Sequence, residues 1–101
     1  MIVFEWDPEK NEINIRKHKI SFEEASTVFY DEEAIVFDDP DHSDESEERF
    51  IIMGVSNKAN MLMVCHCYRN RDRIIRIISA RKATKSEEKD YIEIRKGWLR
   101  K

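Results

Sequence analysis

The residues best suited to chemistry lie in a basic segment near the C-terminal end, between Arg73 and Lys82. A guanidinium fixed at the end of a rigid strand can hold a phosphate through two hydrogen bonds and stabilise charge that develops on it. Arg76 and Arg81 are candidates of this kind. The alternative is a structural role, in which each arginine forms an ion pair with one of the many carboxylates of the chain.

The same segment has the pattern of a central β-strand. Strict alternation sorts its side chains into two faces, one with Ile75, Ile77, Ser79 and Arg81 and the other with Ile74, Arg76, Ile78 and Ala80. Both faces are apolar in the middle, which is typical of a strand buried on both sides. Arg76 and Arg81 then point in opposite directions, and they can line one pocket only if a β-bulge intervenes. Arg81 is the first choice for this reason and because it lies toward the end of the strand.

A second cluster consists of Asn14, Lys17 and His18. Asn14 and His18 are four residues apart, which places them on one face of a helix. His18 could exchange protons near neutral pH, and Lys17 could bind a phosphate as a point charge. The structural alternative for His18 is a favourable interaction with the dipole at the C-terminal end of a helix.

Other kinds of site are not supported by the sequence. Cys65, His66 and Cys67 are closely spaced metal ligands, but no second pair with the spacing of a structural zinc site is present, and His66 points away from both cysteines in a strand. No serine has the glycine neighbours of a nucleophile elbow, and Gly54 and Gly97 cannot form a phosphate-binding loop. We therefore expect neither a metal site nor a cofactor.

Short helices and strands must position these residues. Residues 2–6 have the pattern of a strand, and Asp7 and Pro8 suit the N-cap and first position of a helix that runs to about His18. Ser21 begins a capping box, so a second helix follows at once. The first two helices should form a hairpin.

Four further apolar segments and a last helix follow. The predicted strands are residues 34–37, 49–55, 61–68 and 73–81, joined mostly by short loops that favour antiparallel neighbours. Thr84 and Glu87 form another capping box at the start of a last helix, Lys85 to about Lys96. This segment carries an apolar stripe that consists of Tyr91, Ile94 and Trp98. The order strand, helix, helix, four strands, helix predicts an α+β fold in which helices cover one side of an antiparallel sheet.

The length and composition predict one globular domain, residues 1–101. We expect this domain in the cytoplasm. A chain of 101 residues can bury a single core, and no apolar run has the length of a membrane span or the flanks of a signal peptide. The net charge of -3 conceals a separation of signs, because residues 31–50 carry ten acidic groups and residues 68–101 carry twelve basic ones. We expect residues 38–48 to form an exposed acidic loop. The basic third can attract a phosphate backbone, although a solvated surface without a ligand is the alternative.

Several separated motifs form a recognisable pattern. They are Phe4-Glu5-Trp6-Asp7-Pro8, Asn14, Lys17-His18, Ser21-Phe22-Glu23-Glu24-Ala25, Val28-Phe29, Arg76-Ile77-Ile78-Ser79-Ala80-Arg81-Lys82-Ala83, Glu87 and Tyr91. In this order they closely resemble the BrnT family. The chain departs from the family at Asn11, where alanine is common, and at Lys19, where glycine usually follows the Lys-His pair. Lys19 must adopt a left-handed conformation or end the helix differently.

The resemblance implies a RelE-like ribonuclease toxin of a type II toxin-antitoxin system, which cleaves RNA and arrests translation and growth. It also implies a BrnA-like antitoxin with a ribbon-helix-helix DNA-binding fold as partner in a hetero-oligomer. That complex would repress its own operon, so the toxin would meet operator DNA only through the antitoxin. The implied reaction is metal-independent attack of the ribose 2′-OH on the adjacent phosphorus.

For this reaction we expect arginines to contact phosphate and a histidine, lysine or tyrosine to assist proton transfer. The catalytic candidates are Arg81, Arg76, His18, Lys17 and Tyr91, and the RNA-binding candidates are Arg49, Arg73 and Lys82. A noncatalytic module that only pairs with an antitoxin, or an inactive relative, is the alternative. Direct DNA binding is less well supported, because no short helix carries a dense basic face.

Overall fold

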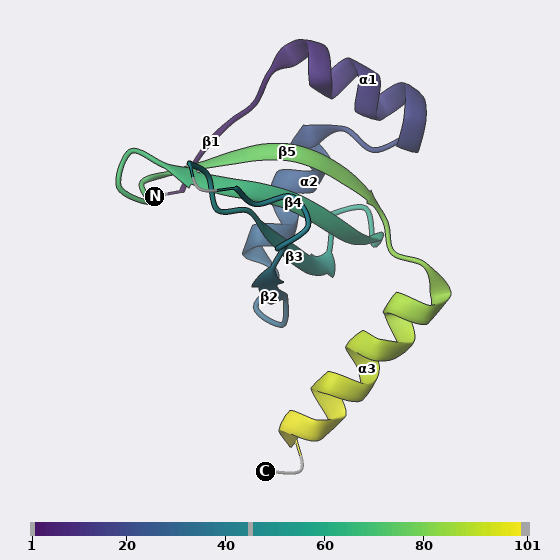
Figure 1. Cartoon of the computed structure of the whole chain (residues 1–101). Coiled ribbons are helices and arrows are strands. Elements are labelled where there is room, and N and C mark those ends of the chain that lie inside the picture. The colour runs from purple at the N-terminus through teal and green to yellow at the C-terminus, as the bar shows by residue number, and fades with distance from the viewer. Residues whose placement is uncertain (1, 45, 100–101) are drawn as a thin grey trace.

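The computed structural model describes residues 2–44 and 46–99, and its N-terminal part is a short strand followed by two helices (Figure 1). These elements are β1 (Val3–Glu5), α1 (Pro8–His18), α2 (Phe22–Thr27) and the single-turn 3-10 helix η1 (Val28–Tyr30). The Asp7 carboxylate caps α1 by accepting a hydrogen bond from the Glu9 N–H at 2.9 Å. The Ser21 hydroxyl accepts one from the Glu24 N–H at 3.0 Å and caps α2. Both helices therefore begin where their capping residues predict.

Lys19 ends α1 in the left-handed conformation, with φ at 63° and ψ at 24°. Its backbone N–H donates to the Ile15 carbonyl at 2.9 Å. This is one of the two geometries that the sequence left open for a lysine in place of glycine. A side chain in this conformation costs roughly 1 kcal/mol relative to glycine.

The remaining elements are four strands and a long helix, namely β2 (Ile35–Asp38), β3 (Phe50–Val55), β4 (Met61–Arg69), β5 (Ile74–Lys82) and α3 (Lys85–Leu99). The five strands form one sheet in the order β1-β5-β4-β3-β2. Strands β2 to β5 pair antiparallel, but β1 lies parallel to β5. The expectation of an antiparallel sheet is therefore wrong for β1. Most of the chain separates β1 from β5, so no short loop dictates their relative direction.

The helices meet both faces of the sheet, not one face as the sequence suggested. The core under α2 and the end of α1 consists of Ile20, Phe22, Ala25, Val28, Ile52, Leu62, Val64, Ile77 and Ala80. Helix α3 meets the opposite face at Tyr91, which is 8% exposed and packs on Met53 and Met63. Beyond this contact α3 extends away from the sheet (Figure 1), and Ile94 on its predicted apolar stripe is exposed. The side chain of Trp98 lies outside the described residues.

A β-bulge interrupts the alternation of β5. Cys65 on β4 pairs with Ser79, and the next residue, His66, pairs with Ile77. Ile78 is therefore left without a partner on β4. An extra residue of this kind reverses the side-chain directions beyond it relative to strict alternation.

The bulge brings Arg76 and Arg81 to the same face. Arg76 lies opposite Cys67 and Arg81 lies opposite Met63. Because Cys67 and Met63 are four residues apart on the regular strand β4, their side chains point to one side, and so do the two arginines. Assigning the arginines to opposite faces by strict alternation is thus wrong, whereas the condition for sharing a face, a bulge, is met. The same shift turns Ala80 into the core.

Asn14 makes three hydrogen bonds, of which two join α1 to β5 and one joins α1 to the turn before α2. Its amide nitrogen donates to the carbonyls of Ile20 at 2.9 Å and Ala80 at 2.8 Å. Its amide oxygen accepts the Ala80 N–H at 3.1 Å. Asn14 is only 5% exposed, so water cannot replace these bonds.

Asn14→Asp should destabilise the fold by on the order of 3 kcal/mol, because a carboxylate cannot donate to two buried carbonyl oxygens. The matched control is Asn57→Asp, since Asn57 is exposed and its amide oxygen, the atom that contacts Thr27, is retained in aspartate. Urea unfolding of the three proteins checks this. Equal unfolding free energies for Asn14→Asp and the control would show that the three bonds contribute nothing.

Candidate active site

A pocket of about 240 Å³ opens on the face of the sheet toward which Arg81 points. Its polar lining residues are His18, Asp39, His42, Arg49, Cys65, Ser79 and Arg81, and its apolar ones are Ile51, Met63, Ile78 and Ala80. Three of the residues predicted to act on RNA, His18, Arg49 and Arg81, are therefore brought together here although they are far apart in the sequence.

Each of these three residues lies at or next to the end of an element. Arg81 is the penultimate residue of β5, Arg49 immediately precedes β3, and His18 is the last residue of α1. Asn14, about one helical turn before His18, holds this end of α1 against the backbone of Ala80. The bulge in β5 then directs the neighbouring Arg81 toward the pocket.

Glu87 of α3 holds Arg81 in a bidentate ion pair. Nη1 and Nη2 of Arg81 donate to Oε1 and Oε2 of Glu87 at 2.7 and 2.8 Å. Glu87 also accepts from the Thr84 N–H at 2.8 Å, which completes the predicted capping box. The hydrogen bonds from Arg81 lower the pKa of Glu87 to about 2. Arg81 therefore forms the structural ion pair that was the alternative to a phosphate contact. Even so, 42% of its side chain is exposed beside the pocket.

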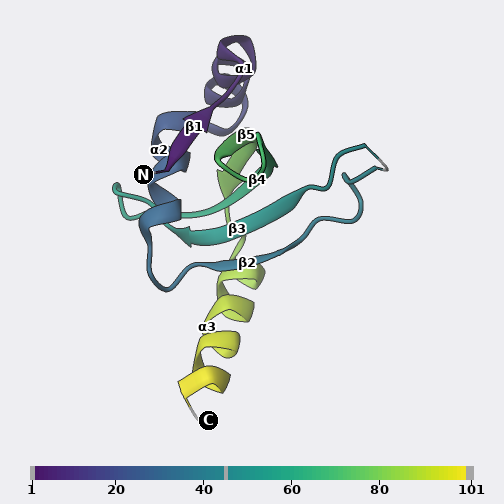
Figure 2. The same cartoon turned by 90° about the vertical axis from the view of Figure 1, so that its left-hand side faces the viewer.

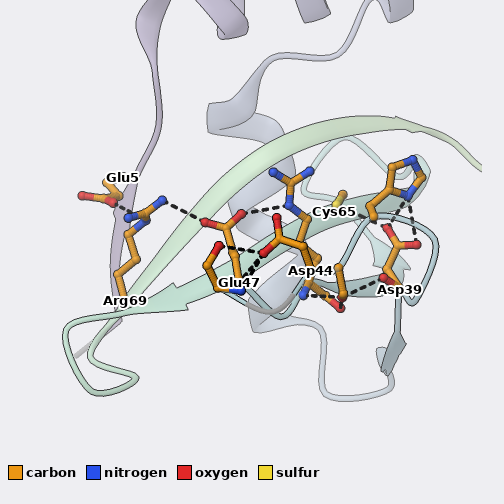
Figure 3. A network of polar contacts seen from close by, with 10 residues as sticks. Glu5, Asp39, Asp44, Glu47, Cys65 and Arg69 are labelled. Atoms are coloured by element: carbon orange, nitrogen blue, oxygen red, sulfur yellow. Dashed lines mark hydrogen bonds and ion pairs between the residues drawn. The ribbon is translucent and has the colours of Figure 1, made fainter.

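A row of alternating charges continues from the pocket toward β1. Arg49 Nε donates to Glu47 at 2.9 Å, and this contact raises the pKa of Arg49. Glu47 also accepts from Arg69 at 3.1 Å. Figure 3 shows Arg69 between Glu47 and Glu5, and Arg69 Nε lies 3.5 Å from Glu5. Arg76 ends the row by donating to Glu5 at 3.2 Å, so the structural alternative holds for Arg76, which is not among the pocket residues.

Sequence reasoning missed Asp39, His42 and Cys65. The connection between β2 and β3 extends from the sheet (Figure 2), but Asp39 at its base is only 6% exposed. The expectation that residues 38–48 are all exposed is therefore wrong at Asp39. Its carboxylate oxygens lie 2.9 and 3.0 Å from Nδ1 of His42 and one of them lies 3.6 Å from Sγ of Cys65. The available sequence signal was the turn spacing of Asp39 and His42, three residues apart around a proline.

The other predicted residues lie outside this pocket. They are Lys17, Arg73, Lys82 and Tyr91. Lys17 and Lys82 are exposed, and Arg73 lines a separate hollow near the N-terminal end. The hydroxyl of Tyr91 donates to the Glu33 carbonyl at 3.1 Å, and burial raises the pKa of Tyr91. Tyr91 therefore packs against the sheet, as its place on the apolar stripe of α3 predicts.

Two other features of the described residues are poor candidates for binding RNA. A hollow of about 500 Å³ is lined by the carboxylates of Glu47, Glu48 and Asp72 and by one cation, Arg69, which is already paired with Glu47. The excess of negative charge repels phosphate. His66 is fully buried against Phe29, on the opposite side of β4 from its cysteine neighbours, and burial lowers its pKa.

No group of three or more metal-ligating side chains gathers in the described ranges. None of the helices there is long and apolar enough to cross a membrane.

Glu87→Gln should lower the stability of the protein at neutral pH. The folded-state pKa of Glu87 is depressed to about 2, so the stabilisation is present above its ordinary value of 4.5 and is lost as the pH falls toward 2. The variant should therefore lose less stability than the wild type over this pH range. Thermal unfolding at several pH values measures the effect, with Glu88→Gln at the exposed neighbour as control. Parallel pH profiles for wild type and Glu87→Gln would contradict the assignment.

Comparison with known proteins places the chain in a family. The family described as “Ribonuclease toxin, BrnT, of type II toxin-antitoxin system” matches residues 6–87. The crystal structure of the ribonuclease toxin BrnT of Brucella abortus is similar, with a TM-score of 0.63, 22% sequence identity, and coverage of 84% of this chain and 100% of that chain. At this identity the likeness shows a shared fold. A comparison with curated proteins gave no match. Because the family match extends over most of the chain, the protein belongs to the BrnT family of ribonuclease toxins of type II toxin-antitoxin systems.

Proposed function

We propose that the pocket is the active site of an endoribonuclease that cleaves RNA and thereby arrests translation and growth. The observation that carries the proposal is the presence of Arg49, Arg81 and His18 in one pocket. Two guanidinium groups can bind and stabilise a phosphate, and an imidazole can exchange a proton at neutral pH. Membership of a family of ribonuclease toxins supports the same reaction.

In the proposed reaction, the ribose 2′-OH attacks the adjacent phosphorus and displaces the 5′ oxygen of the next nucleotide. Arg81 and Arg49 contact the non-bridging oxygens and stabilise the negative charge that grows on them in the transition state. We propose that no metal ion is needed, because the two guanidinium groups supply positive charge where a metal ion would otherwise do so.

Glu87 leaves part of Arg81 available for RNA. A guanidinium has five N–H groups, and those that contact Glu87 and the Lys82 carbonyl come from Nη1 and Nη2. The Nε–H and one N–H of Nη2 therefore remain available for a phosphate. The bidentate ion pair can thus orient Arg81 while the substrate binds to its other edge.

We also propose the partner and the wider fold group. A type II system pairs its toxin with a protein antitoxin, and we assign this role to a BrnA-like protein with a ribbon-helix-helix DNA-binding fold. The resulting hetero-oligomer would repress its own operon, with the antitoxin making the DNA contacts. The small sheet with a pair of helices packed on one face supports assignment to the RelE-like group.

A noncatalytic module that only binds an antitoxin is the second candidate. The observation that favours it is the bidentate pairing of Arg81 with Glu87, which gives the central arginine a structural role. The two functions differ in the effect of expressing the protein without an antitoxin, since only a nuclease should degrade RNA.

Induced expression in a bacterial host should arrest growth and degrade RNA, and Arg81→Ala should abolish both effects. The matched control is Arg16→Ala, because Arg16 is exposed on α1 and is not a pocket residue. Thermal unfolding of purified Arg81→Ala separates lost catalysis from lost stability, because a variant that stays folded at the growth temperature can lose toxicity only through its site. Growth and intact RNA in cells that express the folded wild-type protein would favour the noncatalytic module.

Purified protein should cleave RNA in the presence of EDTA, either free or on added ribosomes. The 5′ fragments should end in a 2′,3′-cyclic phosphate, because the attacking group is the neighbouring 2′-OH. A single 2′-deoxy substitution at the cleaved position should block the reaction and serves as the substrate control. Loss of cleavage in EDTA that added Mg²⁺ restores would show that the reaction depends on a metal ion.

A further inference from the structure

The base of the β2–β3 connection carries a histidine held by a buried carboxylate. Asp39 is 6% exposed, and its oxygens lie 2.9 and 3.0 Å from Nδ1 of His42. The backbone fixes this arrangement, because the Asp39 N–H donates to the Arg49 carbonyl at 3.0 Å and the Ser43 hydroxyl donates to the Asp39 carbonyl at 2.8 Å. The His42 ring itself is 65% exposed at the pocket.

We propose that His42 is the general base of this pocket and that Asp39 is its positioning residue. The inference deepens the proposed nuclease function and depends on it. Because Nδ1 faces a carboxylate, the ring proton belongs on Nδ1, which leaves Nε2 as the acceptor. A carboxylate behind a histidine orients the ring and stabilises the imidazolium that forms when Nε2 takes a proton.

His42 is better placed for this role than His18, the other histidine of the pocket. His18 has no hydrogen bond or ion pair to a carboxylate within the described part of the chain, so its ring orientation is not determined in the same way. Cys65 also contacts Asp39, but burial raises the pKa of Cys65 to about 11. The thiol therefore stays neutral near pH 7 and does not compete with the imidazole for protons.

The proposed step is balanced in atoms and protons. As the bond from the 2′ oxygen to phosphorus forms, Nε2 of His42 accepts the 2′-OH proton. The bond from phosphorus to the 5′ oxygen breaks, and the departing oxygen takes a proton from water. His42 then returns its proton to the solvent. Arg49 and Arg81 line the same pocket and contact the phosphate throughout.

His42→Gln should reduce the rate of RNA cleavage about 100-fold or more, the usual contribution of general acid–base catalysis, while RNA binding stays unchanged. Binding is measured with an RNA that carries 2′-deoxyribose at the cleaved position. Added imidazole should restore part of the activity of His42→Ala, an effect that a purely structural role does not produce. The matched control is Asp41→Asn, which should retain activity because Asp41 is the exposed neighbour of His42 and is not a pocket residue.

Substitution of Asp39 tests its role as the positioning residue. Asp39→Asn should lower kcat for RNA cleavage and leave KM nearly unchanged, because Nδ1 of His42 loses the carboxylate that orients the ring while Arg49 and Arg81 still line the pocket. In a His42→Gln background the same substitution should cause no further loss of kcat, because Asp39 acts only through His42. An equal loss in both backgrounds would show that Asp39 does not act through His42.

The outcomes separate the two proposals. If the wild type cleaves RNA, Arg81→Ala does not, and His42→Gln cleaves like the wild type, the assignment of His42 is wrong and the nuclease function stands. The same conclusion follows if imidazole fails to restore a folded but inactive His42→Ala. If the wild type does not cleave RNA with or without ribosomes, both proposals are overturned.

Discussion

The buried carboxamide of Asn14 is the contact on which the arrangement of the pocket depends. One amide both donates and accepts, so it satisfies the N–H and C=O groups of Ala80 and the carbonyl of Ile20 together. These groups lie where α1, the following turn and β5 meet, away from water. The contact therefore determines where His18, at the end of α1, lies relative to Arg81 on β5. No apolar side chain could join the same backbone groups without leaving them unsatisfied.

Local signals in the sequence were sufficient to predict most of the helices and strands and to single out residues that line the candidate pocket. Asp7, Ser21 and Thr84 mark helix starts because a capping side chain acts on N–H groups two or three residues away. The mixed α+β class followed from the order of the apolar segments. Arg81 was identified as a cation toward the end of a strand, a property that depends only on nearby residues, whereas Arg49 was named only as a further cation for the reaction that the family resemblance implies.

The remaining features depend on partners far along the chain. The bulge at Ile78 is a property of the pairing between β4 and β5, and neither strand reveals it by itself. Asp39 is buried because Cys65, 26 residues away, and the Arg49 backbone lie over it, whereas its neighbours in sequence are mostly exposed. The side of the sheet that α3 occupies follows from the pairing of Arg81 with Glu87 and the packing of Tyr91. Composition and periodicity contain no information on these contacts.

The row of alternating charges beside the pocket affects how binding would respond to salt. Arg49, Arg69 and Arg76 are each paired with Glu47 or Glu5, and Arg81 with Glu87. These cations are already neutralised by carboxylates of the same protein. A phosphate backbone that binds beside them would release few of its own counterions in exchange for them. The logarithm of the RNA affinity would therefore fall less steeply with the logarithm of the salt concentration than the number of arginines on this face suggests.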